Sequence, residues 1–324
     1  MTDQTSDQAG DQTRDQTGDP AGDPTGDRAT RILTVDGERA ADVLRIVLEA
    51  FGDRPPLDPP ATALEETEET IRESLDAHGG LLVEHEGVPV GALLLEPRGR
   101  MLGLRRVGVL GTVRGLGVAA QMASRAREIA AARHFGGIEL EARVELPRTV
   151  EFWRRLGYVE AGRNGNRLTM LRLLPIVRIL RTAEDTTAFG GWLATIVRPG
   201  DLIILTGDLG AGKTTMTQGI GAGLGVRGDV TSPTFVISRV HPSLSAGAPP
   251  LVHVDAYRLG GSAELDDLDL DTDIEDAVTV VEWGEGLAEA LAIDRLELSL
   301  KVREDDSREL TLTPVGPRWR ELVI

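Results

Sequence analysis

Apolar residues recur along the chain with two different periodicities, which predict strands and helices in alternation. Short apolar or alternating runs predict strands, and apolar positions three or four residues apart predict helices. Between residues 31 and 174, the expected strands are 31–35, 80–86, 88–97, 101–110, 137–144, 158–162 and 167–174. The expected helices of this part are 38–51, 61–77, 116–133 and 147–157. Glu86 and Gly87 predict a tight hairpin turn between two of these strands.

The second part of the chain shows the same alternation after Pro175. Its expected strands are 176–180, 201–207, 234–240, 251–257, 278–283, 295–302 and 308–315. Its expected helices are 185–196 and one that runs from a glycine-rich loop to Leu224. This alternation predicts α/β architecture in both parts. The two parts are not copies of each other, so we expect two different domains, 31–174 and 176–324.

The first 30 residues have a different composition and predict a disordered, low-complexity tail. Asp recurs at every fourth position from Asp3 to Asp27, and Gly, Pro and Thr are frequent. A segment without an apolar face cannot bury enough surface to offset the entropy lost on ordering. We assign no function to this tail.

Composition excludes several classes of protein. The chain has 324 residues and no cysteine, which excludes disulfides, cysteine-ligated zinc and thiol catalysis. No apolar run approaches the length of a membrane span, and no secretory signal is evident, so we expect a cytoplasmic protein without a membrane partner. The formal net charge is −17. So acidic a chain favours contact with RNA only indirectly, through a partner.

The segment "GDLGAGKT" carries the most specific chemistry in the sequence. Gly207, Gly212, Lys213 and Thr214 match every fixed position of the phosphate-binding loop G-x-x-x-x-G-K-[ST]. The glycines let backbone N–H groups point at phosphate oxygens, Lys213 can neutralise the β- and γ-phosphates, and the Thr214 hydroxyl can bind magnesium. The alternative is a glycine-rich turn that matches by chance. The preceding strand and following helix argue against that alternative.

Two carboxylates follow apolar strands at the positions where α/β sheets carry their ligand-binding residues. Asp255 ends "LVHVD" and Glu282 ends "VTVVE". We expect one of them to hold magnesium and the other to orient or activate the attacking water; in the alternative, each only caps a following helix. Between the loop and Asp255 lies "VTSPTF", where Ser232 and Thr234 are candidates for a nucleotide-sensing switch. A plain loop explains this segment equally well.

Taken together, "GDLGAGKTT", "TSPTF", "VDAYRL" and "VVEWGE" resemble the bacterial TsaE family from about Ile176 to the C-terminus. The resemblance implies a P-loop NTPase sheet with flanking helices, and ATP and Mg²⁺ as cofactors. It implies catalytic roles for Lys213, Asp255 and Glu282, and magnesium on Thr214 and Glu282. The nucleotide-binding residues that it implies are Glu184, Leu209, Gly210, Ala211, Gly212, Lys213, Thr214, Thr215, Asp255 and Arg308.

Members of that family are small ATPases required for threonylcarbamoyladenosine at position 37 of tRNAs. The resemblance therefore implies a complex of TsaD and TsaB as the protein partner, with tRNA reached only through it. It also makes Trp283 a neighbour of the site. His253, in the strand before Asp255, is interpreted as a packed strand histidine.

A second signature, "RGLGVA", follows a strand and opens a long helix in the first part of the chain. It resembles the acyl-CoA motif of the Gcn5-related N-acetyltransferase (GNAT) fold, and "TVEFWRRLGYVEAG" resembles that fold's second marker. The resemblance spans residues 31–174 and implies a mixed sheet with flanking helices. The acetyl-CoA-binding residues that it implies are Val109, Arg114, Gly115, Leu116, Gly117, Val118 and Ala119.

This part departs from the acetyltransferase pattern at one position that matters for catalysis. Trp153 stands where the family usually has a tyrosine, and an indole cannot serve as a general acid. Tyr158 is expected to face elsewhere. Glu139, Glu141 and Glu145 include a candidate base, although a solvated strand face is favoured. Acetylation of an amine, acyl-CoA binding without chemistry and scaffolding therefore remain alternatives.

For the whole chain, three hypotheses follow. It is a tRNA-modification ATPase fused to an acetyltransferase-like domain, an N-acetyltransferase regulated by a P-loop domain, or a non-catalytic nucleotide-binding adaptor. A small-molecule kinase is disfavoured, because the second half lacks an evident arginine-rich lid.

Overall fold

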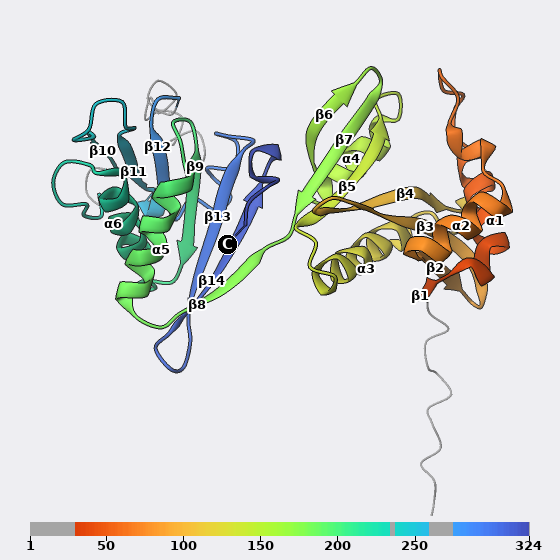
Figure 1. The fold of residues 1–324 in the computed structure, drawn as a ribbon, viewed down its shortest axis with the longest axis horizontal. Coiled ribbons are helices and arrows are strands. Elements are labelled where there is room, and N and C mark those ends of the chain that lie inside the picture. The colour runs from red at the N-terminus through yellow and green to blue at the C-terminus, as the bar shows by residue number, and fades with distance from the viewer. Residues whose placement is uncertain (1–29, 234–236, 259–274, 324) are drawn as a thin grey trace, which may run out of the picture.

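The computed structural model describes residues 30–233, 237–258 and 275–323. The expected disordered tail lies outside the described residues apart from Thr30, and so does Thr234 of the predicted switch. These described residues form two seven-stranded sheets, each with its own helices, and the connection from the last strand of the first sheet to the second is short (Figure 1). The α/β class expected for both halves is confirmed.

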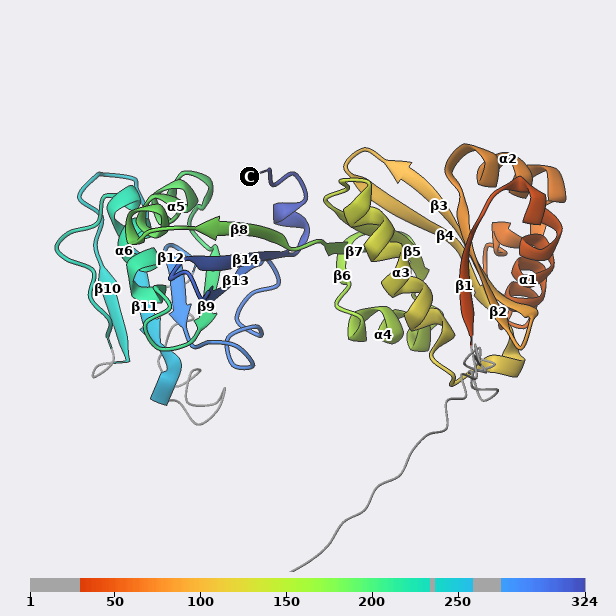
Figure 2. The ribbon, with the colours of Figure 1, turned by 90° about the horizontal axis from the view of Figure 1, so that it is seen from below.

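The first sheet has the strand order β1-β2-β3-β4-β5-β7-β6. Its strands are β1 (Arg31–Val35), β2 (Gly80–His85), β3 (Val88–Arg98), β4 (Met101–Val109), β5 (Gly137–Arg143), β6 (Val159–Asn164) and β7 (Arg167–Leu173). Only β4 and β5 pair in parallel, so the sheet is mixed, as expected. Helices α1 and α2 cover one face, and α3 and α4 cover the other (Figure 2). These helices are α1 (Ala40–Gly52), α2 (Glu68–His78), α3 (Val118–Ala132) and α4 (Pro147–Arg155).

One predicted helix of this half was wrong in its extent. Residues 61–77 do not form a single helix: a 3₁₀ turn over Thr62–Glu65 is followed by an extended break, and α2 begins after Thr67. The Thr67 hydroxyl accepts a hydrogen bond from the backbone N–H of Thr70, so it caps a new helix and ends the preceding turn. The hairpin turn at Glu86 and Gly87 is confirmed, since both residues have positive φ (53° and 78°).

Strands β4 and β5 pair over only part of their length. The parallel register joins residues 101–104 to 137–140 and then stops. A bulge in β4 accompanies this separation, because the pairing with β3 shifts and Arg106 adopts a φ of 53°. Beyond residue 104 the two strands therefore diverge, just ahead of the loop that opens α3.

The second sheet has the order β10-β11-β12-β9-β13-β14-β8. Its strands are β8 (Ile176–Leu180), β9 (Leu202–Gly207), β10 (Ser238–His241), β11 (Leu251–Asp255), β12 (Val278–Glu282), β13 (Arg295–Val302) and β14 (Arg308–Val315). The four central strands, β11, β12, β9 and β13, run parallel, so their carboxyl ends share one edge. Helices α5 (Ala183–Ile196) and α6 (Lys213–Leu224) pack together on one face of this sheet.

Glycines allow α5 and α6 to approach unusually closely. A Cβ on Gly190 would lie 2.3 Å from the carbonyl oxygen of Met216, and one on Gly219 would lie 2.1 Å from that of Thr187. Backbone therefore meets backbone at this interface, and larger residues have no space. Because α6 begins at Lys213, this packing fixes the helix that carries the predicted phosphate loop.

The two halves also contact each other directly. Arg320, near the C-terminus, donates to Glu139 of β5 at 2.5 Å, and Arg98 lies 3.6 Å from the same carboxylate. Leu171 and Leu173 of β7 belong to the same apolar cluster as residues of the second sheet. The expected solvated face was therefore wrong for Glu139, which is 5% exposed and faces the other half of the chain.

Candidate nucleotide site and acyl-CoA loop

The phosphate loop lies between strand β9 and helix α6, as its sequence predicted. Three of its glycines, Gly207, Gly210 and Gly212, have φ of 132°, 78° and 107°, which side chains other than glycine rarely adopt. Gly212 is the N-cap residue of α6, and it has no side chain to accept a hydrogen bond from the first backbone N–H groups of the helix. The N–H groups and the positive end of the helix dipole therefore remain available to an anion.

Lys213 supplies a positive charge to this site, close to its carboxylates. Its ammonium donates to the carbonyl oxygens of Gly207 and Asp208 at 2.7 and 2.9 Å, and it lies 3.8 Å above the Trp283 ring. Burial lowers the pKa of Lys213 from its usual 10.5, while the nearby carboxylates, Glu282 first, act in the opposite direction. The lysine therefore folds back along its own loop.

Glu282 and Thr214 lie together beside the loop. The Thr214 hydroxyl donates to Oε2 of Glu282 at 3.2 Å, and Thr217 donates more weakly to Oε1 at 3.4 Å. Glu282 is 3% exposed and is the last residue of β12. No helix follows it directly, so the alternative in which it caps a helix does not apply. The structure thus places the two predicted magnesium ligands side by side.

Asp255 ends the neighbouring strand in register with Glu282. Its Oδ2 accepts from the Ser232 hydroxyl at 2.9 Å, and its Oδ1 accepts from the backbone N–H of Tyr257 at 3.2 Å. Asp255 therefore does cap the short turn that follows, as the alternative held, and also contacts the predicted switch segment. That contact joins Ser232 to the edge of the sheet where the phosphate loop lies.

The donor set around Glu282 fits Mg²⁺. Magnesium prefers oxygen ligands and usually takes only one or two from protein, the rest coming from substrate phosphates and water. The Thr214 hydroxyl and the Glu282 carboxylate supply two oxygens at the mouth of an anion-binding loop. Among the described residues, no group of three or more His, Cys, Asp or Glu side chains forms a separate metal cluster.

Three further predicted nucleotide contacts lie at the same edge of the sheet. Glu184 is in the first turn of α5, whose Thr186 lies 3.6 Å from a Cβ built on Gly212 of the loop. Arg308 begins β14, opposite Leu180 at the end of β8. Leu209, at the tip of the loop, is 92% exposed. The structure thus places Glu184 and Leu209 around the loop, while Arg308 lies at the same sheet edge and is half-buried.

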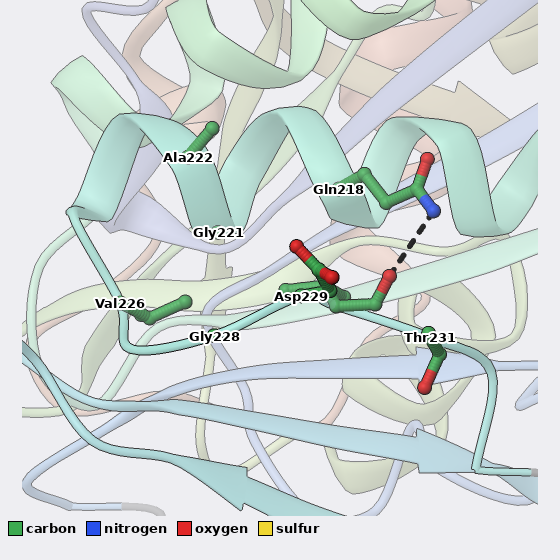
Figure 3. Close-up of a pocket in the computed structure, with 8 residues that line it drawn as sticks. Gln218, Gly221, Ala222, Val226, Gly228, Asp229 and Thr231 are labelled. Carbon is green, nitrogen blue, oxygen red and sulfur yellow. Dashed lines mark hydrogen bonds between the residues drawn. The ribbon is translucent and has the colours of Figure 1, made fainter.

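A pocket of about 460 Å³ lies beside the second half of α6, away from the phosphate loop (Figure 3). It is lined by Gln218, Gly221, Ala222, Val226, Gly228, Asp229, Val230 and Thr231. The Gln218 amide donates to the carbonyl oxygen of Val230 at 3.1 Å across it. This bond ties the segment that leads into Ser232 to the helix that begins at Lys213.

In the first half, the loop between β4 and α3 holds the predicted acyl-CoA motif. Gly115 and Gly117 have φ of 89° and 74°, and a Cβ at either would meet only open space, so their conformation and not crowding requires glycine. Gly117 caps α3 without a side-chain hydrogen bond. The Arg114 guanidinium is paired with Asp53 at 2.5 Å, while the backbone N–H groups at the helix start remain for an anion.

The acid and base candidates from the sequence in this half are each buried or paired with an arginine. Tyr158 is 1% exposed, and burial raises its pKa to about 12. Trp153 is also buried and packs edge-on against Tyr158, with ring centroids 5.0 Å apart. Glu141 is paired with Arg167, and the hydrogen bonds from Arg143 hold the pKa of Glu145 to about 2.

An apolar parallel strand, a glycine loop with Lys213 and Thr214, and a helix together define a P-loop nucleotide-binding protein. Residues 180–310 match the family model "Threonylcarbamoyl adenosine biosynthesis protein TsaE", and residues 42–158 match "Acetyltransferase (GNAT) family". The chain belongs to the TsaE family and carries a GNAT domain ahead of the P-loop half.

Sequence relatives agree with this assignment. The TsaE protein of Streptomyces coelicolor is 60% identical over 135 residues, which are 40% of this chain and 90% of that protein. The TsaE protein of Bacillus subtilis is 42% identical over 140 residues, 43% of this chain and 85% of that protein. The crystal structure of Bacillus YdiB is 36% identical, with a TM-score of 0.38, over 45% of this chain and 89% of that one. The coenzyme A complex of a Thermoplasma acidophilum N-acetyltransferase is 11% identical, with a TM-score of 0.41, over 45% of this chain and 99% of that one.

Sequence reasoning assigned no role in the P-loop site to two side chains that contact Glu282. Thr217 lies one turn of α6 beyond Lys213, and His253 contacts Glu282 across the sheet. A signal existed for His253, because it lies two residues before Asp255 and strand alternation puts both on one face. Thr217 had a signal of the same kind, because residues three and four positions apart lie on one face of a helix.

Proposed function

We propose that the P-loop half binds ATP with Mg²⁺, hydrolyses it, and thereby serves threonylcarbamoyladenosine modification of tRNA. The observation that carries this proposal is the contact of Thr214 with Glu282 beside Lys213, in a chain of the TsaE family. The proposed partner is the TsaD–TsaB complex. A net charge of −17 supports contact with tRNA only through that partner. The proposed location is the cytoplasm; no helix in the described part of the chain is long and apolar enough to span a bilayer.

In the proposed mechanism, backbone N–H groups from Leu209 to Thr215 hold the phosphates, and Lys213 moves from its carbonyl partners to the β- and γ-phosphate oxygens. Thr214 and Glu282 would hold Mg²⁺, which neutralises developing charge on the phosphates when it is bound. Asp255 orients the attacking water and accepts its proton. Ser232 and Thr234 form a switch that reports nucleotide state through Asp255. Glu184 and Arg308 contact the rest of the nucleotide.

For the first half, we propose acetyl-CoA binding at the loop that opens α3, through Val109 and residues 114–119. The family match over residues 42–158 and the uncapped helix start at Gly117 support this. Strands β4 and β5 also separate beyond residue 104, just ahead of this loop, which supports acetyl-CoA binding there. Acetyl transfer to an amine is the alternative function of this half. We take 31–174 and 176–324 as the limits of the two domains.

Complementation of a TsaE-deficient bacterium tests the main proposal with the full chain. Lys213→Ala should fail to restore the tRNA modification, because the loop loses the charge that faces the phosphates. Gly117→Val, which alters only the acyl-CoA loop, should restore it and should weaken acetyl-CoA binding in calorimetry. Full restoration by Lys213→Ala would refute the ATPase proposal, and undiminished acetyl-CoA affinity in Gly117→Val would refute the proposal for the first half.

A further inference from the structure

His253 is a completely buried polar residue in the middle of an apolar strand. Strand β11 otherwise buries Leu251, Val252 and Val254 before it reaches Asp255. Burying an imidazole here costs free energy unless hydrogen bonds replace its water contacts. Its Nε2 lies 2.9 Å from Oε1 of Glu282, and the two side chains are 0% and 3% exposed. Within the described part of the chain, the hydrogen bond of this histidine is thus made to a proposed magnesium ligand.

The partners of the two ring nitrogens determine where the proton lies. An ionised carboxylate only accepts hydrogen bonds, so Nε2 must donate to Glu282. Nδ1 is buried and has no hydrogen-bond partner among the described residues. The geometry thus places a hydrogen on Nε2.

This bond completes a set that restrains both oxygens of Glu282. Oε1 accepts from His253, with Thr217 at 3.4 Å, and Oε2 accepts from Thr214 at 3.2 Å. Without His253, Oε1 keeps only the long contact to Thr217, and the carboxylate is free to rotate about its last bond. The direction of Oε2 relative to the Thr214 hydroxyl then loses its main restraint.

We propose that His253 is a positioning residue of the nucleotide site: its Nε2–H holds Oε1 of Glu282, so that Oε2 stays directed toward Thr214. This inference rests on the proposed binding of ATP and Mg²⁺ at the loop. Residues that orient a metal ligand through its second atom typically change metal affinity about 10–100-fold when they are replaced. His253 is predicted to act on metal affinity in this way.

The chain offers a matched control in His241. It lies on the neighbouring strand β10, is 4% exposed, and has its ring centroid 6.5 Å from that of His253. Its Nε2 has no hydrogen-bond partner among the described residues, so it makes no contact with Glu282 through that atom. Replacing either histidine by leucine therefore removes an equally buried ring, but only one replacement removes the bond to Glu282.

The test measures binding of a fluorescent ATP analogue to the full chain as Mg²⁺ is titrated, with a parallel series in EDTA. His253→Leu should raise the Mg²⁺ concentration for half-maximal binding about 10–100-fold. His253→Gln, whose amide nitrogen can donate from a similar position, should remain close to wild type, and so should His241→Leu. Binding in EDTA should be the same for all four proteins.

Equal Mg²⁺ dependence in His253→Leu and His241→Leu would overturn the inference. Absence of any Mg²⁺-dependent binding by the wild type would instead refute the proposed function, so the two failures are distinguishable. Nitrogen NMR of the wild-type imidazole provides a second test that needs no variant. A proton on Nε2 of His253 supports the inference, and a bare Nε2 contradicts it even if His253→Leu does not fold.

Discussion

Replacement of Gly190 by alanine tests whether α5 and α6 are packed as closely as the structure shows. A Cβ at this position would lie 2.3 Å from the carbonyl oxygen of Met216 and 2.9 Å from the backbone nitrogen of Ile220, about 1 Å inside ordinary contact for the nearer atom. Both obstacles are backbone atoms of α6 and cannot rotate away. Its neighbour Gly191 is the matched control, because the nearest atom to a Cβ there is 3.9 Å away.

The expected changes in the free energy of unfolding have opposite signs for Gly190→Ala and Gly191→Ala. Alanine in the interior of a helix is favoured over glycine by about 1 kcal/mol, so Gly191→Ala should raise the free energy of unfolding by up to that amount. At Gly190 the same gain is opposed by overpacking, which costs about 1–3 kcal/mol and more where backbone must move. We expect Gly190→Ala to lower the free energy of unfolding by about 2 kcal/mol.

Denaturant unfolding gives the total change, and hydrogen exchange resolved by peptide locates it. Peptides from α5 and α6 should exchange faster in Gly190→Ala, whereas peptides from α1 and α3 in the other half should be unchanged. Affinity for ATP should fall with the same variant, because α6 begins at Lys213. If Gly190→Ala proves as stable as Gly191→Ala, the close contact between the two helices is not present and the reasoning fails.

Three other predictions follow from buried and charged groups. Arg320→Ala should destabilise the chain by about 1–2 kcal/mol, because Glu139 then keeps only the longer contact to Arg98. Adding Glu139→Gln should recover part of that loss in denaturant unfolding. No recovery would argue against a buried pair. Burial first, and then His253 and Arg239, lower the pKa of His241 from its usual 6.5. As the pH falls, His241 is therefore protonated in the unfolded chain before it is protonated in the folded chain. The free energy of unfolding should therefore fall as pH drops below about 6.5, and His241→Asn should reduce that slope; equal slopes would contradict the assignment. Thr214→Val should weaken nucleotide binding in Mg²⁺ and leave binding in EDTA unchanged, and an equal loss in both would show that the hydroxyl does not act through the metal.

The phosphate loop was predictable because its information is local. All the glycines that need positive φ, the lysine and the threonine lie within eight consecutive positions, between a strand and a helix that hydrophobic periodicity predicts separately. Strands such as 295–302 and 308–315 were predicted with their observed limits for the same reason. The helix predicted over 61–77 shows the weakness of periodicity, which does not register a cap such as Thr67 within an otherwise regular pattern.

Contacts between distant positions were not accessible in this way. The bond from His253 to Glu282 spans 29 positions and depends on which strands are neighbours and in which register. The burial of Glu139 depends on Arg320, which is 181 positions away and in the other half. Periodicity describes each element alone, so it placed Glu139 on a solvated face that the second half of the chain covers.

The central claim is that the P-loop site hydrolyses ATP on behalf of a protein partner. The most direct measurement is phosphate release by the full chain with and without purified TsaD and TsaB, with Lys213→Ala as the control. We predict Mg²⁺-dependent release by the wild type that rises when both proteins are added, and none from Lys213→Ala. Release that is unchanged by the two proteins, or equal in the wild type and Lys213→Ala, would contradict the claim.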